Sequence, residues 1–249
     1  MTPGVGITTV TYEGLSFVRR VLVWREQESS AIFGGAMSAK GLLGKIVPIL
    51  LLVSSAKAQF GTYTVNDDSV TVGATFVSTQ TVYNTGLSFN PQLHFGTPWS
   101  FAFNYSRLLK SKGVFGFRAE LPVAFYRNMG LNLAAHGIPN DIGAVFLTPS
   151  VRVNIFQDEG VSPWVSVGGG YGRFWESSNE EFYGTNPGPT GTNTGVVQFG
   201  AGLDIWVWKH WGFRGEARDF YSGEPAVNVD TNRSRMHNYY VGAGVVHRF

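Results

Sequence analysis

The sequence predicts an all-β protein, a closed antiparallel transmembrane β-barrel of eight strands. Three observations support this fold class. Segments of roughly ten residues alternate between apolar and polar side chains, as strands of membrane barrels do. Short and long connections alternate between these segments, and the last segment, residues 238–249, finishes on an aromatic residue. A period of two indicates strands whose two faces meet different surroundings.

The composition agrees with many short, tightly packed strands. The chain has 249 residues, a net charge of +2, 32 glycines, 14% aromatic residues and 14% charged residues. Soluble domains usually contain roughly 25% charged residues. The absence of cysteine from the sequence excludes disulfides and thiolate metal sites. We expect no nucleic-acid partner, because lysines and arginines form no cluster. We also expect no cofactor or metal, because the histidines are scattered and the loop carboxylates lack ligand spacing.

A secretory signal peptide is predicted inside the N-terminal region. Lysines follow Met37, an apolar run covers residues 46–53, and Ala56 and Ala58 form a small-residue cleavage site. This order of three parts is typical of a signal peptide, whereas a buried core helix would not require it. We expect three regions, an upstream over-extension, the signal peptide and the mature barrel, at residues 1–36, 37–58 and 59–249.

Seven strands are predicted in the second part of the chain. They occupy residues 100–109, 113–127, 144–156, 162–174, 196–208, 211–220 and 238–249. The first strand of the barrel lies before them, and residues 69–79 and 86–96 both qualify. Because membrane barrels of this kind have an even number of strands, we expect one of the two to be a lead-in or a loop.

The alternation assigns each side chain to the lipid face or to the barrel interior. A soluble sandwich or lipocalin-like barrel would place its charges, many of them lysines, on the outside, but these strands contain almost no lysine. We therefore expect the charged face to point inward as a network that neutralises itself between adjacent strands. Its members are Arg118, Glu120, Arg152, Asp204, Arg214, Glu216 and Arg218.

Aromatic residues near the strand ends predict the two girdles of a membrane barrel. They are Trp99, Tyr105, Trp164, Tyr171, Trp208, Trp211, Tyr239 and Phe249. No helix follows the glycine pairs Gly168/Gly170 and Gly200/Gly202, so they are not phosphate loops. We expect these glycines to leave room for large interior side chains such as arginine.

The mature chain resembles the small eight-stranded barrels of the bacterial outer membrane. Its ending, VGAGVVHRF, resembles their C-terminal assembly signal, although His247 stands where an apolar residue or tyrosine is usual. The resemblance implies that the barrel-assembly machinery reads Tyr239, Val241, Val245 and Phe249. It also implies an outer-membrane monomer in contact with lipid and lipopolysaccharide, with periplasmic termini and long extracellular loops.

Several runs also resemble, in order and spacing, the lipid A deacylases: SRLL, ELPVAF, VSPWVSVGGGYGRF, FGAGLD and RDFYSG. Those enzymes carry a His-x-Ser-Asn pattern on the seventh strand. Here Phe220 replaces the histidine and Gly223 the asparagine around Ser222. A serine without a base is a weak nucleophile. We therefore expect a non-enzymatic structural or surface-interaction protein with a filled interior. A narrow porin-like channel and a deacylase-like enzyme are the alternatives.

Overall fold

The computed structural model describes residues 68–79, 82–83, 92–132, 137–231 and 234–249. The predicted over-extension and signal peptide, with Ala56 and Ala58, lie outside the described residues. Among those described, no helix has the length and hydropathy to cross a membrane. The described strands instead form a single antiparallel sheet.

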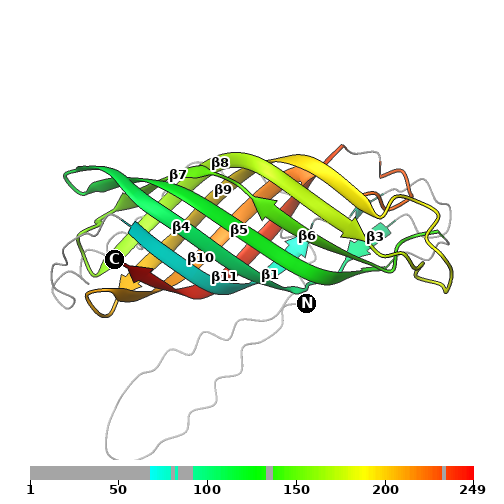
Figure 1. Cartoon of the computed structure of the whole chain (residues 1–249), viewed down its shortest axis with the longest axis horizontal. Coiled ribbons are helices and arrows are strands. Elements are labelled where there is room, and N and C mark those ends of the chain that lie inside the picture. The colour runs from blue at the N-terminus through cyan, green and yellow to red at the C-terminus, as the bar shows by residue number, and fades with distance from the viewer. Residues whose placement is uncertain (1–67, 80–81, 84–91, 133–136, 232–233) are drawn as a thin grey trace, which may run out of the picture. The chain divides into compact units, whose positions relative to one another are not determined.

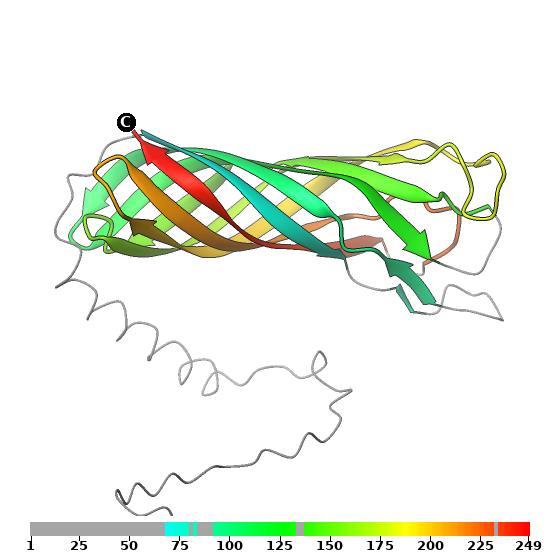
Figure 2. The same cartoon turned by 90° about the horizontal axis from the view of Figure 1, so that it is seen from below.

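Nine of the strand segments build the wall of a barrel. They are β1 (Asp68–Thr79), β4 (Trp99–Lys112), β5 (Phe115–Asn132), β6 (Asp141–Leu147), β7 (Ser150–Ile155), β8 (Val161–Glu176), β9 (Gly191–Trp206), β10 (Trp211–Gly223) and β11 (Arg235–Arg248). Each pairs with its neighbours in an antiparallel direction, and the tilted strands wind around a common axis (Figures 1 and 2).

The sheet closes on itself between its first and last strands. β1 pairs with β11 from Ser69 opposite Arg248 to Thr79 opposite Asn238. On its other side β1 pairs with β4, so neither β1 nor β11 is left as an open edge. Closure lets the backbone groups of the first and last strands pair inside the sheet, as hydrocarbon surroundings demand.

β6 and β7 together form one strand of the barrel. Both lie between β5 and β8, and they keep one register across the break, with Leu147 opposite Val123 and Ser150 opposite Glu120. The break falls at Pro149, which has no N–H to donate to β8. Counting β6 and β7 as one strand gives eight strands around the ring, and the predicted fold class is confirmed.

The first strand of the barrel is the earlier of the two predicted candidates. β1 covers it completely, whereas the described part of the second candidate, residues 92–96, contains the short strand β3 (Gln92–Phe95). β3 pairs with the end of β5 and with β2 (Val82–Tyr83), so it belongs to the connection between β1 and β4. Four residues are too few to cross a bilayer, which takes about 9–11 residues of a tilted strand.

The two ends of the barrel differ in the length of their connections. Short turns lie at the end of the barrel where β11 finishes, at residues 113–114, 156–160 and 207–210. We call this end the turn end. The described parts of the longer connections, residues 137–140, 177–190 and 224–231, lie at the opposite end, called the loop end (Figure 1). The alternation of short turns and long loops predicted from the sequence is therefore present.

The outer wall is apolar over its whole middle section. Large hydrophobic side chains point away from the barrel and are 45–63% exposed, among them Val72, Phe101, Phe103, Val165, Phe199, Phe213 and Val241. A continuous apolar surface of this extent is rare on soluble monomers. It is the surface that a hydrocarbon environment requires of a barrel.

Candidate functional site: the filled interior of the barrel

Inward-pointing side chains fill the barrel in three layers. One layer lies at the turn end, a charged layer occupies the middle, and an apolar layer lies towards the loop end. All seven residues of the predicted charge network point inward into the middle layer. Glu216 is half-buried and the other six are buried.

Asp204 and Arg214 form the best-aligned ion pair of the charged layer. They lie directly opposite each other on β9 and β10. Nε of Arg214 donates to Oδ1 of Asp204 at 2.7 Å, and Nη2 donates to Oδ2 at 2.9 Å. Both side chains are 1% exposed. This two-point geometry is the strong form of the arginine–carboxylate interaction.

Glu120 on β5 gathers the other arginines. Nη1 of Arg218 lies 3.0 Å from its Oε1, and Nη1 of Arg152 lies 3.6 Å from its Oε2. Asn104 and Ser150 donate to the same carboxylate at 2.9 and 3.1 Å. β5 and β10 are not neighbours, so the Glu120–Arg218 pair crosses the lumen. The prediction of pairing only between adjacent strands is wrong for this pair.

Trp164 lies at the centre of the charged layer, and its predicted place in the girdle is wrong. Its side chain is only 2% exposed, and its Nε1 donates to Oδ1 of Asp204 at 3.1 Å. The guanidinium carbons of Arg152, Arg214 and Arg218 lie 5.4, 5.2 and 5.0 Å from the ring centroid. Cation–π attraction at these distances lets one indole separate three like charges.

The glycines of β9 make the room that this arrangement needs. A Cβ on Gly202 would lie 2.4 Å from Cζ2 of Trp164, and a Cβ on Gly200 would lie 2.6 Å from Oγ of Ser166. For Gly168 and Gly170 on β8 the prediction is wrong. A Cβ there would meet the backbone oxygens of Pro149 and Leu147 at 2.4 and 2.1 Å, so these two glycines accommodate the neighbouring strand.

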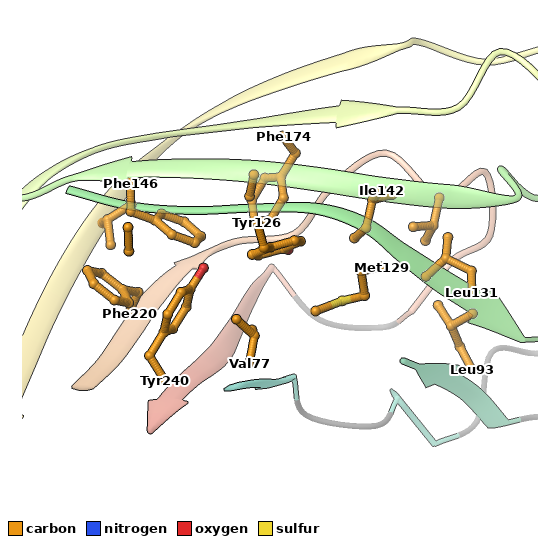
Figure 3. Close-up of a cluster of buried hydrophobic side chains, with 14 of the residues drawn as sticks. Val77, Leu93, Tyr126, Met129, Leu131, Ile142, Phe146, Phe174, Phe220 and Tyr240 are labelled. Atoms are coloured by element: carbon orange, nitrogen blue, oxygen red, sulfur yellow. The ribbon is translucent and has the colours of Figure 1, made fainter. Parts of the chain in front are cut away.

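The loop-end half of the interior contains an apolar layer, which the expectation of an inward charged face did not include. The layer holds Val77, Leu93, Tyr126, Met129, Leu131, Ile142, Phe146, Phe174, Phe220 and Tyr240 among others (Figure 3). Phe146 on β6 and Phe220 on β10 stack across the lumen with centroids 5.0 Å apart. Tyr240 meets both rings edge-on at 6.1 and 4.8 Å.

The loops close this apolar layer from above. Ile138 and Val227 belong to two different connections and are 0% and 3% exposed within the apolar layer. The connections are tied together by hydrogen bonds, such as Glu181 N to Ile138 O at 3.0 Å and Asn228 Nδ2 to Gly137 O at 2.7 Å. Described residues of these connections thus pack on the apolar layer at the loop end.

The turn-end layer is closed by the last strand. The guanidinium of Arg248 lies 3.9 Å from the ring centroid of Trp206, and its Nε donates to the carbonyl of Lys209 at 2.8 Å. Arg248 is 1% exposed and Trp206 is 5% exposed. Gln157 in the turn before β8 is buried beside them at this end, where its amide donates to Ser111.

The residues aligned with the deacylase pattern also lie inside the barrel. Phe220 and Ser222 are both 0% exposed. Oγ of Ser222 donates to the carbonyl of Gly223 at 2.8 Å and accepts from Nδ2 of Asn238 at 3.0 Å. This is the environment of a structural serine that anchors two neighbouring strands.

The other aromatic residues of the predicted girdles lie on the outer wall. Tyr105 is half-buried, and the exposed ones are Trp99, Tyr171, Trp208, Trp211, Tyr239 and Phe249. The side chains of the predicted assembly signal also point outward. Tyr239, Val241, Val245 and Phe249 are 42–58% exposed. Over the described residues there is no group of three histidines or carboxylates placed to hold a metal ion.

Comparisons with known proteins identify the fold. No protein-family model and no curated protein sequence match the chain. The outer membrane protein OprG from Pseudomonas aeruginosa superposes with a TM-score of 0.51 at 12% identity, over 76% of this chain and 99% of that one. Neisserial surface protein A gives a TM-score of 0.47 at 14% identity, over 73% of this chain and 97% of that one. The outer membrane enzyme PagL gives a TM-score of 0.41 at 10% identity, over 71% of this chain and 97% of that one. The likeness to OprG shows that the chain has the fold of the small outer-membrane β-barrels.

Proposed function

We propose that the protein is a non-enzymatic barrel of the bacterial outer membrane, with a structural or surface-interaction role and an interior closed to solutes. The observation that carries this proposal is the filling of the lumen at three levels by buried side chains. An eight-stranded barrel is just wide enough for side chains to fill it, whereas a 16-stranded porin leaves an aqueous channel. In this proposal, the charged, apolar and turn-end layers together block the passage of solutes through the lumen.

The proposed orientation places the turn end in the periplasm and the loop end outside the cell. Membrane barrels of this kind have short periplasmic turns and longer extracellular loops. β1 begins and β11 ends at the turn end, where the Phe249 N–H donates to the Asp68 carbonyl at 3.1 Å. The outer strand face that ends in Phe249 is then available to the barrel-assembly machinery during insertion.

The loops are the surface through which the protein would meet partners. Phe182 and Tyr183 lie in the loop between β8 and β9 and are 42% and 101% exposed. Because the loops hydrogen-bond to each other, they present these rings on an ordered support. We propose a monomer in contact with membrane lipid and lipopolysaccharide, since every strand of the barrel wall has exposed apolar side chains.

Refolded protein in a planar lipid bilayer tests the closed interior. We expect a conductance at the background of the bare bilayer, because each layer blocks the lumen. A gel run with and without boiling checks the fold in the same samples, since closed membrane barrels unfold in SDS only on heating. Large, steady conductance would contradict the closed barrel and support the narrow channel. A soluble protein without a heat-dependent shift would contradict the membrane location.

The deacylase-like alternative is tested by incubating the refolded protein with outer membranes and following the release of acyl chains from lipid A. The burial of Ser222 and the phenylalanine at position 220 support the prediction of no release. Acyl release that is lost in Ser222→Ala would contradict the non-enzymatic proposal.

A further inference from the structure

A polar cluster interrupts the apolar outer wall near the loop ends of β10 and β11. Nδ1 of His237 lies 2.7 Å from Oδ2 of Asp219, and the two side chains are 37% and 22% exposed. The rings of Tyr221 and Tyr239 flank His237 at centroid distances of 4.7 and 5.6 Å. An ionisable pair on the lipid-facing side of a membrane protein is unfavourable unless a partner stabilises it, and it therefore indicates a functional site.

Asp219 still has an acceptor to satisfy. Its Oδ1 is buried, and no described residue donates a hydrogen bond to it. A buried acceptor without a donor is destabilising, and a ligand that carries a hydroxyl or an amine would remove this penalty. The carboxylate thus favours a ligand with hydrogen-bond donors.

A cation completes the cluster on its loop-end side. The guanidinium of Arg235 lies 5.6 Å from the ring centroid of Tyr221, and its Nη1 donates to the carbonyl of Gly195 at 3.5 Å. These two contacts hold the side chain across β10. A guanidinium has five N–H donors in a planar arrangement that matches phosphate. Arg235 and the nearby imidazole of His237 therefore favour a phosphate group.

A hollow in the outer wall adjoins the same carboxylate. Its volume is about 310 Å³, and Phe199, Ala201, Ala217, Asp219, Tyr239 and Val241 line it. Ala201 and Ala217 lie opposite each other on β9 and β10, so the floor of the hollow is shallow and apolar. An acyl chain fits a depression of this kind on a wall that faces hydrocarbon.

We infer that this part of the outer wall binds one phosphate-bearing membrane lipid. The acyl chain lies in the hollow, the phosphate contacts Arg235 and His237, and a headgroup hydroxyl or amine donates to Asp219. The tyrosines at the same level mark the membrane interface, where headgroups lie. The inference rests on the proposed membrane location, and it goes beyond it by naming the site and the chemistry of the lipid.

Native mass spectrometry of the refolded barrel in detergent micelles tests the site. Phosphatidylglycerol, which has a phosphate and free hydroxyls, should bind at least fivefold more tightly than diacylglycerol with the same chains. Arg235→Gln combined with His237→Gln should remove this preference. Ala217→Leu should weaken both lipids, because it fills the hollow. Arg107→Gln is the matched control, since Arg107 is an outward cation, 63% exposed, at the turn end.

The role of Asp219 has its own measurement. Phosphatidylcholine has the phosphate but no hydrogen-bond donor, so it should bind more weakly than phosphatidylglycerol, and Asp219→Asn should reduce that difference. Equal binding of phosphatidylglycerol and diacylglycerol would overturn the inference. So would an equal loss in the Arg107→Gln control, or full competition by inorganic phosphate. A gel with and without boiling is run on each variant, so loss of the barrel itself is recognised as a failure of the fold.

Discussion

Glu120 is the residue on which the charged layer depends most directly. Its carboxylate meets Arg218 and Arg152 and accepts hydrogen bonds from Asn104 and Ser150. The Glu216 side chain, in contrast, is 8% exposed and pairs with Arg218 at 3.1 Å. Removal of one partner from a buried ion pair is more harmful than loss of the whole pair, because the remaining charge stays buried and uncompensated.

Glu120→Gln should therefore lower the free energy of unfolding by about 3–5 kcal/mol. Glu216→Gln should lower it less, because Arg218 keeps Glu120 as a partner at 3.0 Å. Urea unfolding of the barrel in lipid vesicles, followed by the gel shift, measures both. Equal effects of the two substitutions would contradict the central position of Glu120.

At the residue scale, strand alternation was sufficient to point the seven charged side chains inward. The assignment of Trp164 failed because its position near the start of a strand was given more weight than its alternation. Trp164 shares its face with Ser162 and Ser166, which are buried. An indole N–H inside a protein usually finds an acceptor, and Asp204 provides one. Both signals were present in the sequence.

At the scale of the strand, β9 shows how glycine spacing fits a neighbouring aromatic. Gly202 points inward below Trp164, and the added Cβ would also lie 2.5 Å from the carbonyl of Gly215. Gly195 lies on the same strand with nothing within 4 Å of an added Cβ. Both glycines lie on β9, but a Cβ would clash at Gly202 and would meet no atom at Gly195.

Gly202→Ala should lower the free energy of unfolding by about 1–3 kcal/mol, the usual effect of overpacking. It should also disturb the Trp164–Asp204 hydrogen bond, which the emission spectrum of the tryptophans would report. Gly195→Ala, the control, should leave stability unchanged or raise it slightly, since alanine loses less entropy on folding. The prediction fails if the two variants have the same unfolding midpoint.

The strand count was accessible from the sequence, but the choice of the first strand was not. Residues 69–79 and 86–96 both alternate, and alternation alone does not say which segment pairs with the last strand. The decision comes from register, since β1 matches β11 over its length and also pairs with β4. The described part of the second segment pairs instead with β2 and the end of β5.

At the scale of the whole molecule, the layers of the interior could not be predicted. Alternation states which side chains point inward, but contacts across the lumen depend on the tilt and stagger of the strands. Arg218 and Glu120 are 98 residues apart and lie on strands that do not touch. Phe146 and Phe220 meet across the lumen in the same way. Alternation within single strands therefore does not predict the apolar layer in the loop-end half of the barrel.

Layers that fill one lumen act in series, so loss of one should leave the passage blocked. Trp164→Ala opens the charged layer and Phe146→Ala opens the apolar layer, and each should lower stability by about 3–5 kcal/mol, as large-to-small core substitutions do. Neither should raise the conductance of a planar bilayer above its background, because the remaining layers still fill the barrel. Phe101→Ala is the outward control, since Phe101 is 63% exposed on the lipid face and its loss creates no interior cavity. Steady current through either inward variant would show that a single constriction, rather than the layered interior, closes the barrel.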